Sequence, residues 1–148
     1  MKYFTIEELC KSSVAKKNKI DNTPSEEIIE NLTEFTDEFL DKLREVWGSP
    51  IKVSNGFRCE ELNKKVGASK TSAHLKGFAA DLKPVNGDID GLVACAIELS
   101  KTLNFDQIID EYSGNKHWLH IGYKNLKGQQ RRRIMTYKNE KYYFIPTK

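Results

Sequence analysis

A run of apolar residues spaced three and four apart constrains the fold of this chain most strongly. It lies between Thr23 and Gly48 and contains Ile28, Ile29, Leu32, Phe35, Phe39, Leu40, Leu43, Val46 and Trp47. This spacing places apolar side chains on one face of a helix. Thr23-Pro-Ser-Glu26 supplies a start signal with Pro24 at the first helical position, and Gly48-Ser-Pro50 supplies the end. The sequence therefore predicts one long amphipathic helix.

The two halves of the chain predict different kinds of element. In the first half, Thr5-Ile-Glu-Glu8 has the form of a capping box and predicts a short helix, whereas residues 11–22 are interpreted as a polar, irregular segment. In the second half, short strands are expected over 51–54, 78–82, 105–112, 118–123, 133–137 and 142–145, and helices over 59–66 and from Asp88 or Asp90 to about 103. Helices followed by a strand-rich half predict a single α+β domain over 1–148.

Composition and charge exclude several classes of function. No apolar run approaches the roughly 18–20 residues that cross a bilayer, so we expect no membrane partner. The first residues lack the apolar run of a signal peptide, so we expect synthesis in the cytoplasm. The net charge of +3 is too small to indicate nucleic-acid binding. Arg131-Arg-Arg133 has no interleaved aromatic residues, and we interpret it as the solvated beginning of a strand.

Histidine and aspartate interrupt two strands that are otherwise apolar. Asp81 lies within the predicted strand 78–82 and His120 within 118–123, while His74 lies in the polar loop before the first of them. A buried carboxylate is costly unless it is paired or bound to a metal. Two histidines and one carboxylate, with a fourth position open to water, form the donor set of a catalytic zinc site. The alternative is a polar loop and ordinary paired side chains, because the pattern does not show that the three residues converge.

The histidine and aspartate residues belong to a longer pattern. Ser72-x-His-x-x-Gly-x-Ala-x-Asp81, followed by Trp118-Leu-His120, resembles the signature of the M15 zinc peptidases. This family of D-Ala-D-Ala carboxypeptidases and L-Ala-D-Glu endopeptidases includes many phage endolysins. The flanking segments also resemble its M15A-like branch, from about residue 4 to 137. The resemblance implies a hedgehog/D-Ala-D-Ala peptidase-like α+β fold, with a small antiparallel sheet that carries the zinc site and is flanked by helices.

The resemblance also implies roles for individual residues. One zinc ion would be held by His74, Asp81 and His120. Arg58 matches an arginine that binds the substrate carbonyl or carboxylate and stabilises the oxyanion, for which a fixed guanidinium is suited. Ser72 matches the serine of the motif and is expected in substrate binding. From spacing alone, Arg58 would be a solvated turn residue and Ser72 a loop or cap residue.

The pattern leaves the general base open between two residues. Many members of the family carry Asp or Glu three residues before the last zinc ligand, where this chain has His117. Imidazole can accept a proton near neutral pH, but residues three apart on a regular strand face opposite sides, so His117 requires a bend before Trp118. Glu111, at the end of the preceding predicted strand, is the rival base, and Asp110 is a third alternative.

The predicted function is zinc-dependent hydrolysis of a peptide bond in peptidoglycan stem peptides, as in a phage lysin. We expect a monomer that acts at the cell wall after phage-type release and has no nucleic-acid partner. Which bond is cut stays open. The alternative is a weak or inactive zinc-holding module that binds the wall or serves as a phage structural component, because the acid before His120 is missing.

Overall fold

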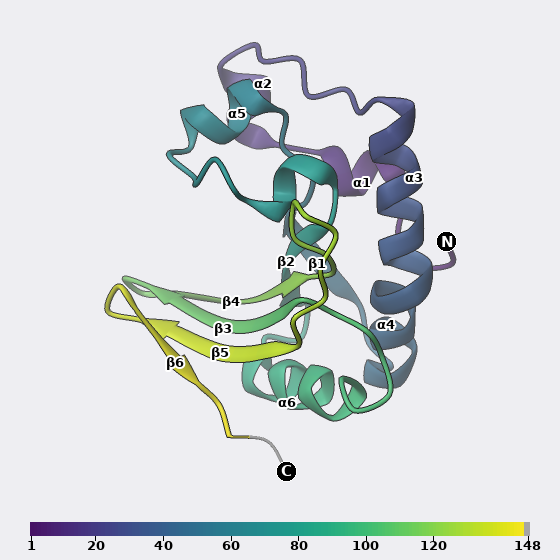
Figure 1. Ribbon diagram of the computed structural model, residues 1–148, viewed down its shortest axis with the longest axis vertical. Helices are drawn as coiled ribbons and strands as arrows, with labels where there is room; N and C mark the ends of the chain where they lie inside the picture. Colours follow the sequence, from purple (N-terminus) through teal and green to yellow (C-terminus); the bar gives the residue numbers. More distant parts are fainter. Residues whose placement is uncertain (147–148) are drawn as a thin grey trace.

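Helices cover a six-stranded sheet in the computed structural model, which describes residues 1–146 (Figure 1). In chain order the elements are α1 (Ile6–Cys10), α2 (Ser13–Lys17), α3 (Glu26–Phe35), the π-helical turn η1 (Thr36–Leu40), α4 (Asp41–Trp47), β1 (Ile51–Asn55), α5 (Glu60–Lys65), the 3-10 turn η2 (Ala73–Lys76), β2 (Ala79–Pro84), α6 (Ile89–Leu99), β3 (Gln107–Ser113), β4 (Lys116–Gly122), β5 (Arg133–Lys138) and β6 (Lys141–Phe144). No helix among these residues combines the length and apolar character needed to cross a membrane.

The predicted long helix is present as α3, η1 and α4 in direct succession. Its cap is Ser25, whose hydroxyl accepts a hydrogen bond from the amide of Ile28 at 3.3 Å, so Pro24 lies before the cap and not at the first helical position. Gly48 ends the helix in the left-handed region at φ 76°. The residues buried along its apolar face are Ile28, Leu32, Phe35, Phe39, Leu40 and Leu43.

The polar segment 11–22 contains a helix that the sequence analysis missed, α2. The hydroxyl of Ser12 accepts from the amide of Ala15 at 3.1 Å and starts this single turn. Only Ala15 within it is buried, so the segment has no apolar periodicity that would predict a helix.

The sheet is mixed, which corrects the expectation of a purely antiparallel sheet. The strand order is β1-β2-β4-β3-β5-β6, and β3 and β5 are parallel while the other pairs are antiparallel. Strand β4 ends beside the start of β3, where Gly122 is opposite Gln107. The chain therefore returns on the free side of β3 from that same end, and β5 must run in the direction of β3.

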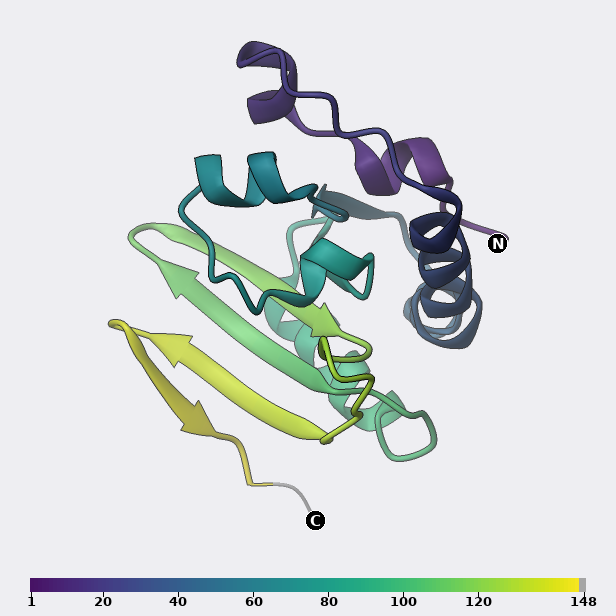
Figure 2. The same ribbon diagram turned by 45° about the horizontal axis from the view of Figure 1, so that its top comes forward.

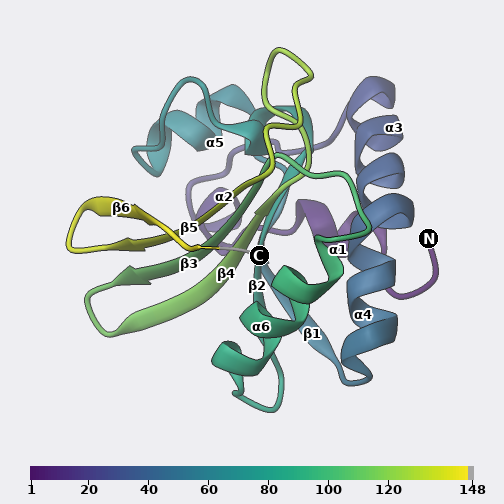
Figure 3. The ribbon, with the colours of Figure 1, turned by 60° about the horizontal axis from the view of Figure 1, so that its bottom comes forward.

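The two faces of the sheet have different surroundings. One face supplies Ala80, Leu82, Ile108, Leu119 and Ile121 to the apolar core, together with α6 and the long helix. Helices α4 and α6 also contact each other there (Figure 3). The opposite face carries Asp81, Glu111, Trp118 and His120, which line a cleft. Strict alternation along each strand sends these polar residues away from the core.

Candidate metal centre

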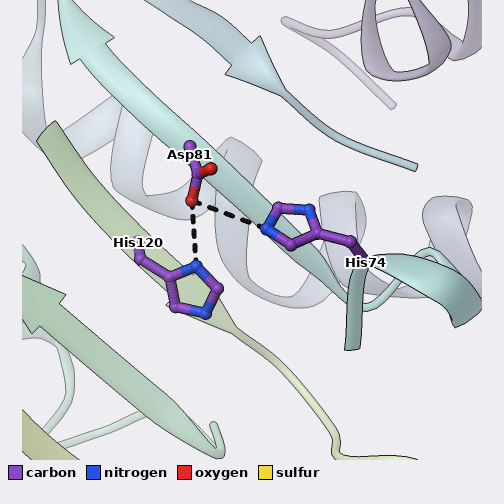
Figure 4. A group of neighbouring side chains, drawn as sticks. All are labelled: His74, Asp81 and His120. Atoms are coloured by element: carbon purple, nitrogen blue, oxygen red, sulfur yellow. Dashed lines mark hydrogen bonds and ion pairs between the residues drawn. The ribbon is translucent and has the colours of Figure 1, made fainter. Parts of the chain in front are cut away.

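Three side chains from separate elements converge in the cleft (Figure 4). His74 comes from η2, Asp81 from β2 and His120 from β4, and their ligand-type atoms all lie within 4.8 Å of one another. Asp81 and His120 are direct partners in the pairing of β2 with β4. The Asp81 Oδ1 atom lies 2.9 Å from His120 Nδ1 and 3.6 Å from His74 Nε2. The three residues that the sequence suggested as metal ligands are therefore brought together.

The loop before β2 holds the His74 ring in one orientation. The Ser72 hydroxyl accepts from the amide of His74 at the start of η2, and Gly77 ends the turn in the left-handed region. The ring Nδ1 lies 2.7 Å from the carbonyl oxygen of Gly56. Because a carbonyl only accepts, Nδ1 carries the proton and Nε2 is free to face Asp81. Fixing a histidine tautomer through its other nitrogen is the usual preparation of a metal ligand.

Gly56 is required where it stands for a steric reason. A Cβ atom at this position would lie 2.0 Å from the carbonyl oxygen of Leu9, which is backbone and cannot move aside cheaply. The same carbonyl accepts from the amide of Phe57 at 2.8 Å. The N-terminal helix α1 thus packs tightly on the turn that orients His74.

The charges of the group suit a cation. Burial lowers the pKa of His74 and favours the neutral imidazole. Burial opposes ionisation of Asp81, but the two histidines outweigh it and hold the pKa of that carboxyl well below its usual range. Burial lowers the pKa of His120 as well, yet Asp81 and Glu111 outweigh it and raise the pKa overall. Two imidazoles with a carboxylate fit a divalent metal, whose binding requires His120 to give up its proton.

Glu111 lies beside this group on the same face of the sheet. Its Oε1 atom is 3.8 Å from His120 Nδ1, and burial raises the pKa of its carboxyl. A carboxylate whose pKa is raised towards neutrality is suited to proton transfer. Glu111 comes from β3, directly opposite Trp118 of β4.

Arg58 is held in the cleft by residues of α5 and the following loop. Its Nε donates to Asn63 Oδ1 at 3.1 Å and its Nη2 to the hydroxyl of Ser72 at 3.4 Å. Burial lowers the pKa of Arg58, and the negative charges of Asp81 and Glu111 partly offset this shift. The guanidinium nevertheless stays charged at neutral pH. Arg58 is thus a fixed cation and not a solvated turn residue.

Asn63 is a positioning residue that the sequence analysis did not identify. It is buried, accepts from Arg58 and donates to the carbonyl of Ser69 at 2.9 Å. Leu62-Asn63 was one of the flanking segments that resemble the family, but a polar residue next to an apolar one in a predicted helix is too common a pattern to assign a role.

His117 lies on the opposite face of the sheet, which corrects its prediction as a general base. It hydrogen-bonds through Nε2 to Asp110 and stacks on Tyr112, with ring centroids 3.9 Å apart and an interplanar angle of 12°. Strand β4 is regular from Lys116 to Gly122, without the bend that the prediction required. Alternation therefore directs His117 away from His120. Asp110, the third alternative, shares the face of His117.

The cleft above the group has a volume of about 800 Å³. It runs between the α5–η2 segment, teal in Figure 2, and the strands β2, β3 and β4. The lining residues include Arg58, Ser72, Glu111, Trp118 and Tyr142. The converging group, Glu111 and Arg58 thus line one continuous cleft, which is large enough for a segment of peptide.

The arginine tract has a structural explanation. Arg131 pairs with the buried carboxylate of Asp106, with Nε–Oδ1 and Nη2–Oδ2 distances of 2.8 Å. Arg132 donates to the carbonyl oxygens of Leu103 and Ser100 at 2.7 and 2.6 Å. These bonds anchor the connection into β5. All three arginines are nevertheless exposed and β5 begins at Arg133, which confirms the solvated beginning of a strand.

Comparison with known proteins agrees with this geometry. A family model described as Peptidase M15 matches residues 2–122, which include all three converging residues, Glu111 and Arg58. A search of curated proteins gave no match. Peptidases of the matched family are metal-dependent, which agrees with the group of possible metal donors in the cleft. Since the match spans far more than half of the sequence, the chain belongs to the M15 family of metallopeptidases.

Proposed function

We propose that this protein is a zinc-dependent peptidase that cuts a peptide bond in the stem peptides of peptidoglycan. One observation carries the proposal: His74, Asp81 and His120 converge in a cleft that is also lined by Glu111 and Arg58. The arrangement combines metal donors, a carboxylate and a fixed cation, which are the parts that peptide hydrolysis requires.

Zinc is the metal that the donor set favours. Two imidazole nitrogens and one carboxylate oxygen are typical ligands of catalytic zinc, which keeps a further position open. When bound, the ion would lower the pKa of a water molecule and polarise the substrate carbonyl. His74, Asp81 and His120 would hold it, with the His74 ring already oriented by Gly56.

Glu111 is the general base in this proposal. It takes a proton from the attacking water and returns it to the nitrogen of the leaving amine. Its position 3.8 Å from His120 Nδ1 and its raised pKa support this role. Glu111 also argues against the inactive-module alternative. No acid lies three residues before His120, but this carboxylate lies beside the group from the neighbouring strand.

Arg58 binds the substrate beside the reacting carbonyl. Asn63 and Ser72 occupy its Nε and Nη2, so the guanidinium is aimed before substrate arrives. It would hold a substrate carboxylate or the negative oxygen that develops during attack. Ser72 therefore supports two residues of the site. It accepts a hydrogen bond from Arg58, and it caps η2 and thereby positions His74.

The substrate class is supported by the resemblance of the sequence to wall-cutting members of the family. The open cleft suits a peptide attached to a polymer, and the net charge of +3 is compatible with an anionic wall. The hedgehog/D-Ala-D-Ala peptidase-like fold, a monomeric state and action at the wall after phage-type release are part of the same proposal.

The test is digestion of purified peptidoglycan. We expect wild-type protein loaded with zinc to release new amino groups, a chelator to abolish the release and added zinc to restore it. E111Q is the matched control, because it should retain zinc and lose activity. A wild-type protein that holds one zinc ion per chain and releases no amine from any wall type would overturn the proposal.

A further inference from the structure

The β5–β6 hairpin adds an aromatic wall to the cleft. Tyr137 of β5 and Tyr142 of β6 are direct partners in the strand pairing, and their rings stack with centroids 4.6 Å apart. Tyr142 lines the cleft yet is 60% exposed. The hairpin forms the outer edge of the sheet (Figure 1) and lies beyond residues 2–122, so family membership assigns it no role.

The wall continues a row of side chains that contains the proposed base. Across the sheet, Trp118 is opposite Glu111, Glu111 opposite Tyr137, and Tyr137 opposite Tyr142. Residues opposite one another project from the same face. Because neighbouring strands lie about 4.8 Å apart and β6 is two strands from β3, the Cα atoms of Tyr142 and Glu111 are about 10 Å apart along this row. The carboxylate thus has aromatic residues on both sides.

The exposed ring of Tyr142 has the chemistry of a sugar-binding surface. One side of the ring packs on Tyr137, which leaves an exposed apolar surface next to a hydroxyl. A tyrosine hydroxyl is protonated at neutral pH and can donate a hydrogen bond, and here burial and the charge of Glu111 raise its pKa further. A pyranose ring is complementary, since it offers a face of C–H groups bordered by hydroxyl groups.

We propose that Tyr142, supported by Tyr137, binds a sugar ring of the glycan strand from which the stem peptide hangs. This inference rests on the proposed function and extends it, because it gives the cleft a second substrate component. The distance of about 10 Å between Tyr142 and Glu111 equals roughly three extended residues. The sugar and the reacting bond would therefore be close in the chain, which favours a cut near the sugar end of the stem peptide.

Binding of glycan alone tests the inference without hydrolysis. The probe is glycan strands freed of their peptides by an amidase, titrated against zinc-loaded protein and followed by NMR. We expect saturable binding to wild type, at least a tenfold loss of affinity in Y142A and a smaller loss in Y142F, which keeps the ring and removes only the hydroxyl. Y143A is the matched control, because Tyr143 lies on the same strand and is 51% exposed but projects from the opposite face.

The outcomes separate this inference from the proposed function. Absent glycan binding by wild type, equal affinity of wild type and folded Y142A, or an equal loss in Y143A would overturn the sugar site. A change from dimer to monomer in Y142A would overturn it too, since β6 would then pair with a second copy. Glycan binding that depends on Tyr142, without amine release, would leave the sugar site standing and reject the peptidase.

Hydrolysis adds a second readout. With glycan-linked stem peptide as substrate, Y142A should raise KM several-fold more than it does with free stem peptide, and Y143A should change neither. A loss that is equal on both substrates would mean that Tyr142 contacts the peptide, which contradicts the inference.

Discussion

Each face of the sheet carries a cluster of histidine and carboxylate groups, and the two clusters differ in what surrounds them. His74, Asp81 and His120 lie in the cleft, while Asp110 and His117 lie on the opposite face of the sheet with Asp90 of α6 next to them. In the first cluster, His74 and Asp81 are buried and the His74 ring is oriented by a backbone carbonyl. In the second, Asp90 is exposed and His117 is already occupied by Asp110 and Tyr112. Residue type alone does not make a metal centre, because burial and second partners decide whether the donors are prepared for an ion.

The largest expected difference between the clusters is in metal content. H120A should reduce bound zinc from one ion per chain to none and abolish hydrolysis, since two donors remain. H117A should keep the zinc and nearly all of the activity. Elemental analysis after gel filtration measures the first effect, and amine release the second. Loss of zinc from H117A with retention in H120A would reverse the comparison.

The next largest difference should come from neutralising one carboxylate on each face of the sheet and comparing kcat. E111Q should lower kcat by about 10²–10⁴-fold with zinc retained, because the general base is lost while the donors remain. D110N, the equivalent change beside His117, should leave kcat within about twofold of wild type. Steady-state kinetics with matched zinc loading makes the comparison, and equal losses in the two variants would refute Glu111 as the base.

A smaller effect is expected from the turn that orients His74. G56A should lower the free energy of unfolding by about 1–3 kcal/mol, because the new Cβ overpacks against the Leu9 carbonyl. It should also weaken zinc binding, since the Gly56 carbonyl fixes the ring of His74. Denaturant titration and zinc competition with a chelating dye measure the two effects. G114A, in the β3–β4 turn, strains a backbone at φ 59° but meets no atom within 4 Å of its Cβ, so it should lower stability and leave zinc affinity unchanged.

The smallest effect concerns the orientation of Arg58. N63A removes an acceptor from a buried guanidinium and should lower kcat/KM by about tenfold, equivalent to about 1.4 kcal/mol. Zinc content should not change, because no donor is touched. Unchanged kcat/KM in a folded N63A protein would show that Arg58 needs no support from Asn63.

Most of the elements could be predicted from the sequence, because periodicity reports which side of an element is buried. The long helix, the α6 helix capped by Asp88 and the six strands all follow from such patterns. The sequence analysis did not predict helix α2, because this helix buries a single alanine and so has no apolar periodicity. The parallel pairing of β3 with β5 was not predicted, because the residue pattern within a strand does not determine which strand pairs with it.

The sequence by itself determined the donor types and their faces. Asp81 and His120 interrupt apolar strands, and alternation in a strand separates them from the core side chains whatever the fold. The tertiary structure decided which carboxylate accompanies them. The pairing of β3 with β4 places Ile109 opposite His120 and so brings Glu111, two residues further along, to the same face, whereas the regular path of β4 turns His117 to the other. Strand pairing joins residues far apart in sequence through backbone hydrogen bonds, and that register is a property of the assembled sheet and not of either segment.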